Sequence, residues 1–359
     1  FSGIGTQAMA LKRLGYQVDH IGISEIDKHA LKSYNAIHGE VKNYGGIGSF
    51  ERMPKDIDIC SWSFPCQDIS LAGKQGGMVD GSRSNYGYVF LDTIENTPYE
   101  ERPKVLLMEN VKALLSKTFS EDWKEIHLRL ERLGYKNYAE SLIATDFGIP
   151  QTRDRVFIVS IKGEYSYTFP KPFKLNKKLK DYLETKVDEK YYLSDKQIEQ
   201  IVNWKAYNKP LENARNENDE TIQTITAKSN TSMNSSMVLI KETTKKGYTE
   251  AEEGNGVYID RPHQKRGVVQ KDKIQTIKTS ANDIGVVVKD TENYLESNVL
   301  GSIDNSRRAW KEDKIMGTIT TNSDTSKVLL NNLRIRKLTP LEAWRLMGID
   351  DEDFHKAKA

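Results

Sequence analysis

The sequence predicts an α/β fold, with a doubly wound and largely parallel sheet followed by a smaller domain rich in strands and loops. Three observations support this. Short apolar segments alternate with helical patterns over residues 1–160, a glycine-rich turn precedes the first helix, and the composition changes after about residue 165. Continuous apolar runs are typical of strands covered on both faces, as in a parallel sheet.

Four apolar, β-branched segments are expected to form the strands of this sheet. They are Val18–Ile23, Ile57–Cys60, Val105–Met108 and Val156–Ile161. Apolar residues at helical spacing predict helices over residues 8–14 and 123–133, and each pattern is followed by a glycine that can end a helix. Ligands of doubly wound sheets bind at the carboxyl ends of the strands, so we expect the functional loops to lie there.

The composition excludes several classes of protein. The chain has 359 residues and a net charge of +2, from 53 basic and 51 acidic side chains, so a nucleic-acid partner requires clustered basic residues. No apolar run approaches the ~20 residues of a membrane span, and no signal peptide is visible. The two cysteines, Cys60 and Cys66, exclude a disulfide framework, and the 6 histidines show no metal-ligand spacing. We therefore expect a cytoplasmic protein without a metal or a membrane partner.

The second part of the chain, residues 171–332, is expected to form a separate domain. Residues 171–180 are rich in lysine and contain no acid, and the following region is rich in Thr, Ser, Asn and Lys. Repeated short β units predict hairpins and loops here, although chance similarity among Thr-rich strands is the alternative. Beyond this region, Thr339 and Glu342 have the spacing of a capping box and predict a last helix. The repeated Thr-rich segments begin at Glu220, Lys273 and Lys314. Each precedes an apolar run that is expected to form a strand, at residues 237–240, 284–288 and 328–330.

A glycine motif opens the first predicted helix. Gly3, Gly5 and Ala8 have the G-x-G-x-x-A spacing, and Glu25 follows 20 residues after Gly5. Glycines let a backbone approach a nucleotide-like ligand closely, and an acid at this distance can hold ribose hydroxyls. Both a dinucleotide and S-adenosylmethionine (SAM) suit this pattern, and these residues alone leave the two open.

Reactive and charged residues flank the other predicted strands. Cys66 lies in the loop after the second strand, where a thiolate can act as a nucleophile, whereas Cys60 lies within that strand and is expected in the core. Glu109 ends the third strand. Arg153 and Arg155 precede the fourth and are expected to project to the same side. Each charged residue alone also suits a solvated surface or an ion pair.

Taken together and in order, these segments resemble the motifs of the DNA (cytosine-5)-methyltransferase family. The resemblance covers nearly the whole chain, and the Thr-rich region occupies the place of the family's target recognition domain. Pro-Cys-Gln, Glu-Asn-Val and Gln-x-Arg-x-Arg in this order are highly specific. The blocks are Phe1-Ser-Gly-Ile-Gly, Glu25-Ile-Asp27, Phe64-Pro-Cys-Gln67, residues 83–92, Glu109-Asn-Val111, Gln151-Thr-Arg-Asp-Arg155 and Arg336-Lys-Leu-Thr-Pro-Leu-Glu342.

The resemblance implies a Rossmann-like, SAM-dependent methyltransferase domain over residues 1–170, a target recognition domain over 171–332, and a return to the catalytic domain from residue 333. It implies that Cys66 attacks C6 of a cytosine flipped out of duplex DNA while Glu109 protonates N3. The implied catalytic residues are Cys66, Glu109, Arg153 and Arg155. Those for SAM are Phe1, Gly3, Ile4, Gly5, Glu25, Ile26, Pro65 and Val89, and those for DNA are Gln67, Ser70, Thr226, Thr279 and Thr320.

The family also implies a monomer of prokaryotic or phage origin, for which a cognate restriction endonuclease is not physically required. One departure from the family pattern is Gly46, which stands where an acid usually contacts the adenine. Because Phe1 is not Met and lies inside a motif, and no final family block follows Ala359, we expect the native chain to extend further at both ends. The alternatives are a tRNA-directed cytosine-5 methyltransferase, a NAD-dependent oxidoreductase and a DNA-binding relative without catalysis.

Overall fold

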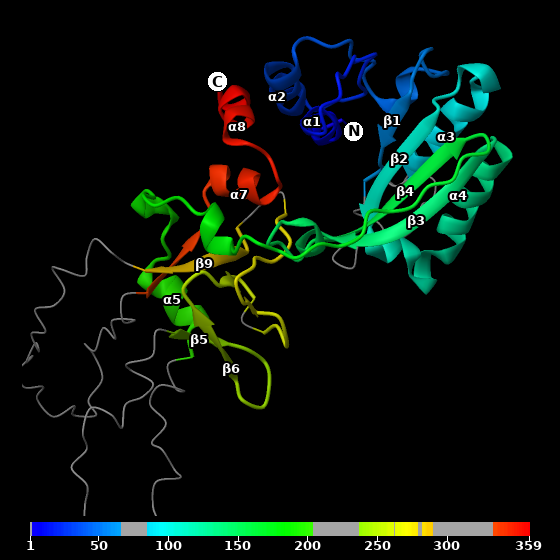
Figure 1. Ribbon diagram of the computed structural model, residues 1–359. Coiled ribbons are helices and arrows are strands. Elements are labelled where there is room, and N and C mark those ends of the chain that lie inside the picture. The colour runs from blue at the N-terminus through cyan, green and yellow to red at the C-terminus, as the bar shows by residue number, and fades with distance from the viewer. Residues whose placement is uncertain (1, 66–84, 204–236, 262, 279–281, 290–332) are drawn as a thin grey trace, which may run out of the picture. The chain divides into compact units, whose positions relative to one another are not determined.

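The computed structural model describes residues 2–65, 85–203, 237–261, 263–278, 282–289 and 333–359 (Figure 1). The chain divides into two compact units. The first consists of Phe1–Asn176 together with Trp344–Ala359, so both ends of the chain belong to it. The second is Lys177–Ala343.

A four-stranded sheet forms the centre of the first unit. Its strands are β1 (Ile59–Trp62), β2 (Val105–Val111), β3 (Tyr135–Ile143) and β4 (Asp154–Lys162), in the order β1-β2-β4-β3. β1 and β2 are parallel, whereas β4 runs antiparallel to both β2 and β3. The predicted α/β class is confirmed, but the described sheet is mixed rather than largely parallel. β3 and β4 follow each other through a short connection, and a short connection permits only antiparallel pairing.

One predicted strand does not form. All of Val18–Ile23 is described, and within it only Ile23 pairs, through a single parallel bridge to Asn43. The other three apolar segments lie in β1, β2 and β4, although β1 begins two residues later than predicted. The predicted helices over 8–14 and 123–133 correspond to α1 (Thr6–Arg13) and α4 (Ser120–Arg132).

Helices α3 (Tyr86–Asn96) and α4 pack on one face of this sheet (Figure 1). The core contains fully buried Leu106 of β2, Ile126 of α4 and Ile158 of β4. Trp62 at the end of β1 stacks on Phe90 of α3, with ring centroids 4.3 Å apart and an interplanar angle of 15°. Burial of each such side chain stabilises the folded state by roughly 1.5–3 kcal/mol. The packing of these side chains therefore holds the ends of β1 and β2 in place.

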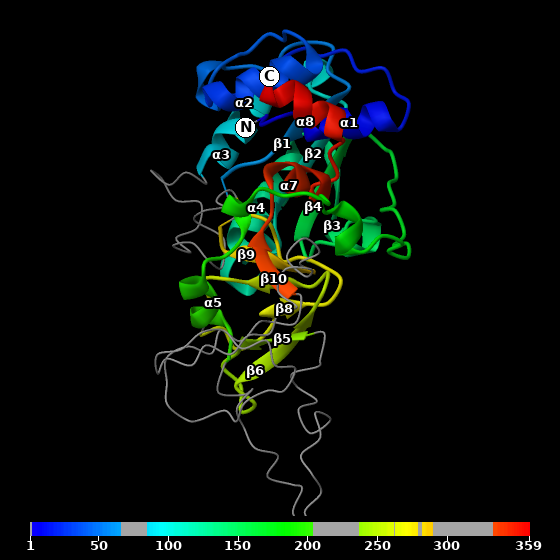
Figure 2. The ribbon, with the colours of Figure 1, turned by 90° about the vertical axis from the view of Figure 1, so that its left-hand side faces the viewer.

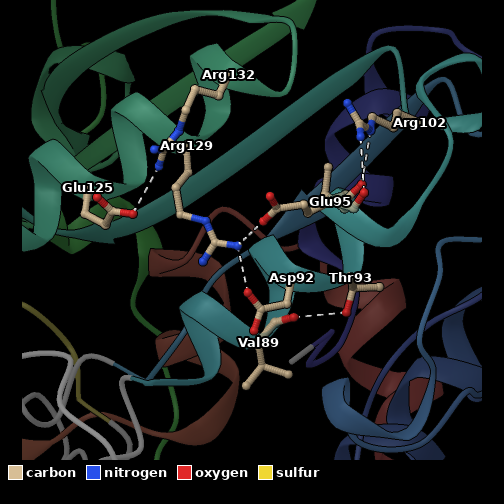
Figure 3. A network of polar contacts seen from close by, with 9 residues as sticks. Val89, Asp92, Thr93, Glu95, Arg102, Glu125, Arg129 and Arg132 are labelled. Atoms are coloured by element: carbon tan, nitrogen blue, oxygen red, sulfur yellow. Dashed lines mark hydrogen bonds and ion pairs between the residues drawn. The ribbon is translucent and has the colours of Figure 1, made fainter.

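Two arginines hold α3 and α4 together (Figure 3). Arg129 of α4 donates from Nη2 to Asp92 and Glu95 of α3, each at 2.7 Å. The carbonyl groups at a helix C-terminus lack partners within the helix, and a guanidinium offers several donors to them. Arg102 satisfies four such oxygens at the ends of both helices, those of Ile94, Glu95, Thr97 and Leu133.

A second helical layer of this unit consists of α1, α2 (Lys28–His38) and α8 (Asp351–Lys358), which lie together in Figure 2. Asp27 caps α2 by accepting from the backbone N–H groups of His29 and Ala30. α8 packs against α2, and Arg13 of α1 forms an ion pair with Asp350 at 2.8 Å. The first 40 residues and the last ten are therefore neighbours in space.

The second unit contains two antiparallel sheets, one with the order β10-β9-β7-β8 and the other formed by β5 and β6. The predicted strands at 237–240 and 284–288 correspond to β5 and β9, whereas the third, at 328–330, lies outside the described residues. The elements are α5 (Asp195–Ile201), β5 (Met237–Lys241), β6 (Tyr248–Glu252), β7 (Gly256–Tyr258), β8 (Val269–Gln270), β9 (Ile284–Lys289) and β10 (Leu333–Lys337).

The predicted capping box precedes the helix α7 (Pro340–Leu346), but this helix is not the last one as predicted, because α8 follows it. The N–H of Thr339 donates to Glu342 Oε2 at 2.8 Å, and the N–H of Glu342 donates to Thr339 Oγ1 at 3.2 Å. Arg336 of β10 donates two further bonds to the Glu342 carboxylate, at 2.7 and 2.6 Å, and both side chains are buried. Within the described part of the chain, no helix is long and apolar enough to cross a membrane.

Short 3-10 helices connect many of these elements. Most of them follow a strand or precede an α-helix, where the chain reverses direction. They are η1 (Ile47–Ser49), η4 (Tyr99–Glu101), η5 (Lys112–Leu115), η6 (Lys117–Phe119), η7 (Ala144–Phe147), η8 (Leu179–Tyr182) and η9 (Glu189–Tyr191).

Candidate active site

The glycine loop before α1 is open on one side and closed on the other. Gly3 and Gly5 have φ values of 55° and 76°, a conformation that side chains other than glycine rarely adopt. A Cβ on Gly3 would meet nothing within 4 Å, whereas a Cβ on Gly5 would lie 2.5 Å from His38 and 2.6 Å from Tyr34. The loop therefore needs Gly5 because rings pack behind it, and it leaves free space at Gly3.

Glu25 ties the glycine loop to the turn before α2. Its carboxylate is buried and accepts from the backbone N–H of Gly3 at 2.9 Å, and from those of Ile26 and Asp27 at the same distance. Burial raises the pKa of a carboxyl group, but these N–H donors outweigh it and lower the pKa of Glu25. Glu25 is therefore an ionised side chain whose position fixes the loop.

Asn43, which the sequence did not single out, holds the backbone of Glu25 in place. Its side-chain oxygen accepts from the N–H of Glu25 at 3.2 Å and from that of Gly45 at 3.0 Å, while its Nδ2 donates to the carbonyl of Glu25 at 2.9 Å. An amide has both a donor and an acceptor end, so one asparagine can join these two turns.

Ile26 and Val89 flank the turn formed by η1. Ile26 is 73% exposed, although it is aliphatic, and its Cγ2 lies 3.5 Å from where a Cβ of Gly46 would be. Val89 of α3 is partly buried, and its Cγ1 lies 4.0 Å from the corresponding position of Gly48. The structure thus presents an apolar side chain to solvent beside a glycine turn.

The segment before Cys66 is attached to the end of β2. Ser63 donates from its hydroxyl to the carbonyl of Glu109 at 2.7 Å, and buried Asn110 donates to the carbonyl of Phe64 at 3.3 Å. Pro65, half-buried, is the last described residue before the gap that begins with Cys66. Asn110 therefore connects two motifs that lie 46 residues apart in the sequence.

The Glu109 carboxylate lies between two arginines. Its Oε1 is 3.3 Å from Nη2 of Arg153 and 3.2 Å from Nε of Arg155. Arg155 is the more buried of the two, with 18% of its side chain exposed against 37% for Arg153. Asp154 between them bonds instead to Lys112 and Ser141, as expected from the alternation of side chains along β4. The two arginines project to one side, as predicted, and both contact Glu109.

Comparison with known proteins then decides the family. The model of the C-5 cytosine-specific DNA methylase family matches residues 1–359. The chain belongs to this family. It is a DNA (cytosine-5)-methyltransferase, an enzyme that transfers methyl groups to cytosine in DNA. The alternatives of a NAD-dependent oxidoreductase, a tRNA-directed enzyme and a non-catalytic relative are not retained.

Similar proteins come from bacteria and phages. The type II methyltransferase M2.ScrFI of Lactococcus lactis subsp. cremoris is 34% identical over 256 residues, which cover 55% of this chain and 70% of that protein. The orphan methyltransferase M.SPRI of Bacillus phage SPR is 28% identical, over 100% of this chain and 89% of that protein. Among solved structures, the Dnmt2 methyltransferase of S. pombe is 21% identical, with a TM-score of 0.45. That match covers 58% of this chain and 65% of the other.

Gln151 begins the Gln-Thr-Arg-Asp-Arg block of this methyltransferase, but its side chain has a structural contact. It is 2% exposed, and its Nε2 donates to the carbonyl of Leu346 at 2.9 Å. The block therefore has two roles, since its arginines contact Glu109 while its glutamine holds a segment 195 residues further along the chain.

The two cysteines of the methyltransferase have different surroundings. Cys60 lies in β1 and packs against the core, and burial raises the pKa of its thiol to about 12. A thiol with such a pKa is a poor nucleophile at neutral pH. Cys66 lies outside the described residues, as do six other predicted site residues, which are Phe1, Gln67, Ser70, Thr226, Thr279 and Thr320. In the described residues, no group of three or more His, Cys, Asp or Glu side chains could hold a metal ion.

Proposed function

We propose that the enzyme transfers a methyl group from SAM to C5 of a cytosine flipped out of duplex DNA, through a covalent bond between Cys66 Sγ and C6. One observation carries this proposal. The Glu109 carboxylate, held by Arg153 and Arg155, lies on the strand end to which the segment before Cys66 is attached. Cys66 follows Pro65 directly in the sequence, and consecutive Cα atoms are about 3.8 Å apart. The nucleophile Cys66 and the proton donor Glu109 would therefore belong to one site.

The proposed chemistry uses these side chains in sequence. Cytosine C5 is too weak a nucleophile to accept a methyl group directly, so the Cys66 thiolate first adds to C6. Glu109, in its protonated form, gives its proton to N3, which neutralises the charge that this addition creates. C5 then gains enamine character and would bond to the methyl group as the methyl–sulfur bond of SAM breaks, which would leave a neutral thioether. Loss of the C5 proton to a base, departure of the thiolate and return of the N3 proton to Glu109 restore the aromatic ring and the free enzyme.

Arg153 and Arg155 would position Glu109 and the base. A guanidinium offers several donors in a fixed plane, so it can hold the carboxylate and still reach the base. The base has to leave the stack because its C5 and C6 atoms are inaccessible in a duplex, which costs a few kcal/mol.

The residues around the glycine loop fit SAM. Gly3 has open space where a Cβ would be, Glu25 is ionised and suits hydroxyl donors, and Ile26 exposes an apolar surface that suits a flat ring. When bound, SAM supplies a methyl group on a cationic sulfur. Gly46 offers no side chain to the adenine, so binding would rely on the backbone and on apolar contacts. The proposed residues are Phe1, Gly3, Ile4, Gly5, Glu25, Ile26, Pro65 and Val89.

We further propose that residues 1–170 form the catalytic domain, to which the chain returns after residue 333, and that 171–332 recognise the DNA sequence. Leu333–Lys337 still pairs within the second unit, and the first unit resumes at Trp344. The lysine-rich segment at 171–180 would contact phosphates, and Gln67, Ser70, Thr226, Thr279 and Thr320 would contact DNA. Exchanging residues 175–330 for those of a relative with a different target should change the methylated sequence and leave the SAM requirement intact. An unchanged target sequence would place recognition elsewhere.

We also propose that the enzyme acts as a monomer and needs no bound endonuclease. The relative M.SPRI is named an orphan methyltransferase, a name that indicates no partner endonuclease for that protein. Sedimentation of the active enzyme on duplex DNA should give one protein copy per site.

The test of the proposed mechanism compares the two cysteines. Cys66→Ala should abolish methyl transfer, whereas Cys60→Ala should retain it, because Cys60 packs in the core and has a raised pKa. Duplex DNA with 5-fluorocytosine at the target should trap a stable adduct, since fluorine cannot leave C5 as a proton does. Denaturing electrophoresis would show this adduct with the Cys60→Ala protein and not with Cys66→Ala. Methylation by Cys66→Ala would refute the covalent mechanism.

A further inference from the structure

Behind the glycine loop, His38 joins α1 to the loop backbone. Its Nε2 lies 3.0 Å from the carbonyl oxygen of Ile4, and its Nδ1 lies 3.3 Å from Nζ of Lys12. An ammonium group can only donate, so Nδ1 must accept from Lys12. The ring is then neutral with its proton on Nε2, and it donates to the Ile4 carbonyl.

His38 belongs to a cluster of three rings. Its centroid lies 4.5 Å from that of Tyr34 and 5.1 Å from that of His20. The Tyr34 hydroxyl is 2.8 Å from Nδ1 of His20, while the buried Nε2 of His20 has no hydrogen-bond partner among the described residues. Together, His38 and Tyr34 occupy the space in which a Cβ of Gly5 would lie. The cluster thus limits how closely the backbone at Gly5 can approach α2.

The charges around the cluster favour neutral rings. Burial is the largest cause that lowers the pKa of His38, and the bond to Ile4 opposes it. The ammonium groups of Lys12 and Lys356 lower the pKa further, against the charge of Asp353. Burial and the neighbouring His38 and Lys12 also lower the pKa of His20, against the opposing charge of Asp19. His38 also faces a cavity of about 270 Å³ between α1, α2 and the last helix, lined by Met9, Lys12, Arg13, Ile37, His38, Asp350, Asp353 and Lys356.

We propose that His38 is a positioning residue for the cofactor, which holds the Ile4 peptide and closes the rear of the glycine loop so that the loop is shaped to bind SAM. This inference rests on the proposed role of that loop in binding SAM. A second proton on the ring would sit on Nδ1 and point at the Lys12 ammonium only 3.3 Å away. The exposed Lys12 side chain would then move away, and the charged ring would be costly to keep in its partly buried place behind Gly5.

The direction of the pH effect follows from this geometry. A histidine whose pKa is lowered in the folded protein stabilises the fold least in acid, because the unfolded chain binds protons at a higher pH than the folded one. The contribution is therefore complete above the ordinary value of 6.5, and it is lost as the pH falls below 6.5 toward the lowered pKa. SAM binding to the folded protein should weaken at still lower pH, as the pH falls through the lowered pKa at which the folded ring takes up its second proton.

Calorimetric titration of SAM into the purified full chain at about pH 8 and about pH 5 tests the proposal, because the lower pH lies well below the ordinary histidine pKa. His38→Ala should raise the dissociation constant roughly tenfold at the higher pH, the effect of losing one well-placed hydrogen bond and the packing around it.

His38→Gln retains an N–H donor but cannot take up a proton. It should bind within about threefold of wild type at the higher pH and lose at least about half of the pH dependence. His29→Ala, an exposed histidine on the same helix, is the matched control and should behave as wild type.

The possible outcomes separate this inference from the proposed function. If the wild-type chain binds no SAM at either pH, the cofactor role of the loop is refuted and this inference falls with it. If the wild type binds but both His38 variants match it at both pH values, the positioning role alone is refuted. Should His38→Ala fail to fold, the pH profile of His38→Gln decides, since a profile identical to wild type refutes the proposal. Amide hydrogen exchange of residues 2–10 gives a readout without SAM, and exchange should be faster in His38→Ala.

Discussion

The glycine loop and the end of β2 are two parts of one unit, and they are stabilised in different ways. The glycine loop is held by backbone groups, by uncharged side chains such as Asn43 and His38, and by one carboxylate that is satisfied by N–H donors. The end of β2 carries a partly exposed carboxylate between two cationic side chains, Arg153 and Arg155. The first region depends on shape, and the second depends on charge.

This difference indicates which kind of substitution should harm each region. Where rings and backbone pack against a glycine, adding one carbon atom produces a clash, even though no charge changes. Where a half-exposed carboxylate meets guanidinium groups, an isosteric change leaves the packing intact but removes the charge and the proton. Steric variants should therefore identify the first region, and isosteric variants the second.

The largest effect after the loss of Cys66 is expected for Glu109→Gln. The amide has the same shape but cannot protonate N3, and general acid catalysis contributes roughly 10²- to 10⁴-fold to a rate. Single-turnover methylation should slow by this amount while DNA binding, measured by fluorescence anisotropy, stays nearly constant.

Glu125→Gln is the control for this prediction. Glu125 lies on α4 with its Oε1 3.3 Å from Nη2 of Arg132, the same distance that separates Glu109 from Arg153. This variant should methylate at the wild-type rate. If Glu109→Gln also stays within about threefold of wild type, Glu109 is a structural residue and not the acid.

The next largest effect is expected for Arg155→Ala. A hydrogen bond to a charged group contributes about 1.5–3 kcal/mol, which corresponds to roughly 10- to 10²-fold in rate if it acts on the transition state. Arg153→Ala should cost less, because Arg153 is 37% exposed and water can replace it, whereas Arg155 is 18% exposed. The order of the two turnover numbers measures this, and a larger loss for Arg153 would contradict the assignment.

Several parts of this site could be predicted from the sequence because they depend on local pattern. The apolar runs at Val105–Met108 and Val156–Ile161 lie in strands, since few other structures accommodate continuous β-branched residues. Two arginines at i and i+2 of one strand project to the same face, as predicted. Their contact with Glu109 depends in addition on the register between β2 and β4, which the sequence does not show.

Other parts depend on long-range contacts that no local pattern reveals. Val18–Ile23 has the composition of a strand, yet it makes only one bridge, because pairing needs a neighbouring strand in register. His38 is the last residue of a helix and follows no motif, and its role depends on Ile4, which is 34 residues away. Asn110 is part of the Glu-Asn-Val block, but its bond to Phe64 is not visible in the sequence, and Asn43 belongs to no block and lies 18 residues from Glu25.

A smaller effect is expected in the glycine loop, where Gly3→Ala and Gly5→Ala should differ. Both residues have positive φ, which costs a non-glycine residue roughly 1–2 kcal/mol. Only at Gly5 would the new methyl group also meet His38 and Tyr34, at 2.5 and 2.6 Å. Thermal unfolding should therefore show a larger loss of stability for Gly5→Ala. Gly3→Ala should mainly weaken SAM binding, by roughly tenfold. Equal losses of stability would indicate that the rings can move away.

The smallest effect on catalysis is expected for Arg129→Ala, which tests whether burial of an arginine ion pair is enough to explain the role of Arg155. Arg129 is 14% exposed and contacts two carboxylates at 2.7 Å, so it is at least as well buried and bonded as Arg155 (Figure 3). Its partners, Asp92 and Glu95, lie on α3 and are themselves 61% exposed, far along that helix from its first turn.

Removing the Arg129 side chain should lower the free energy of unfolding by about 1–3 kcal/mol, as for other hydrogen bonds of charged groups. The turnover number at a temperature where the protein stays folded should remain within about twofold of wild type. If Arg129→Ala instead slows methylation as much as Arg155→Ala, both arginines act through stability, and the charge at the end of β2 has no special role in the reaction.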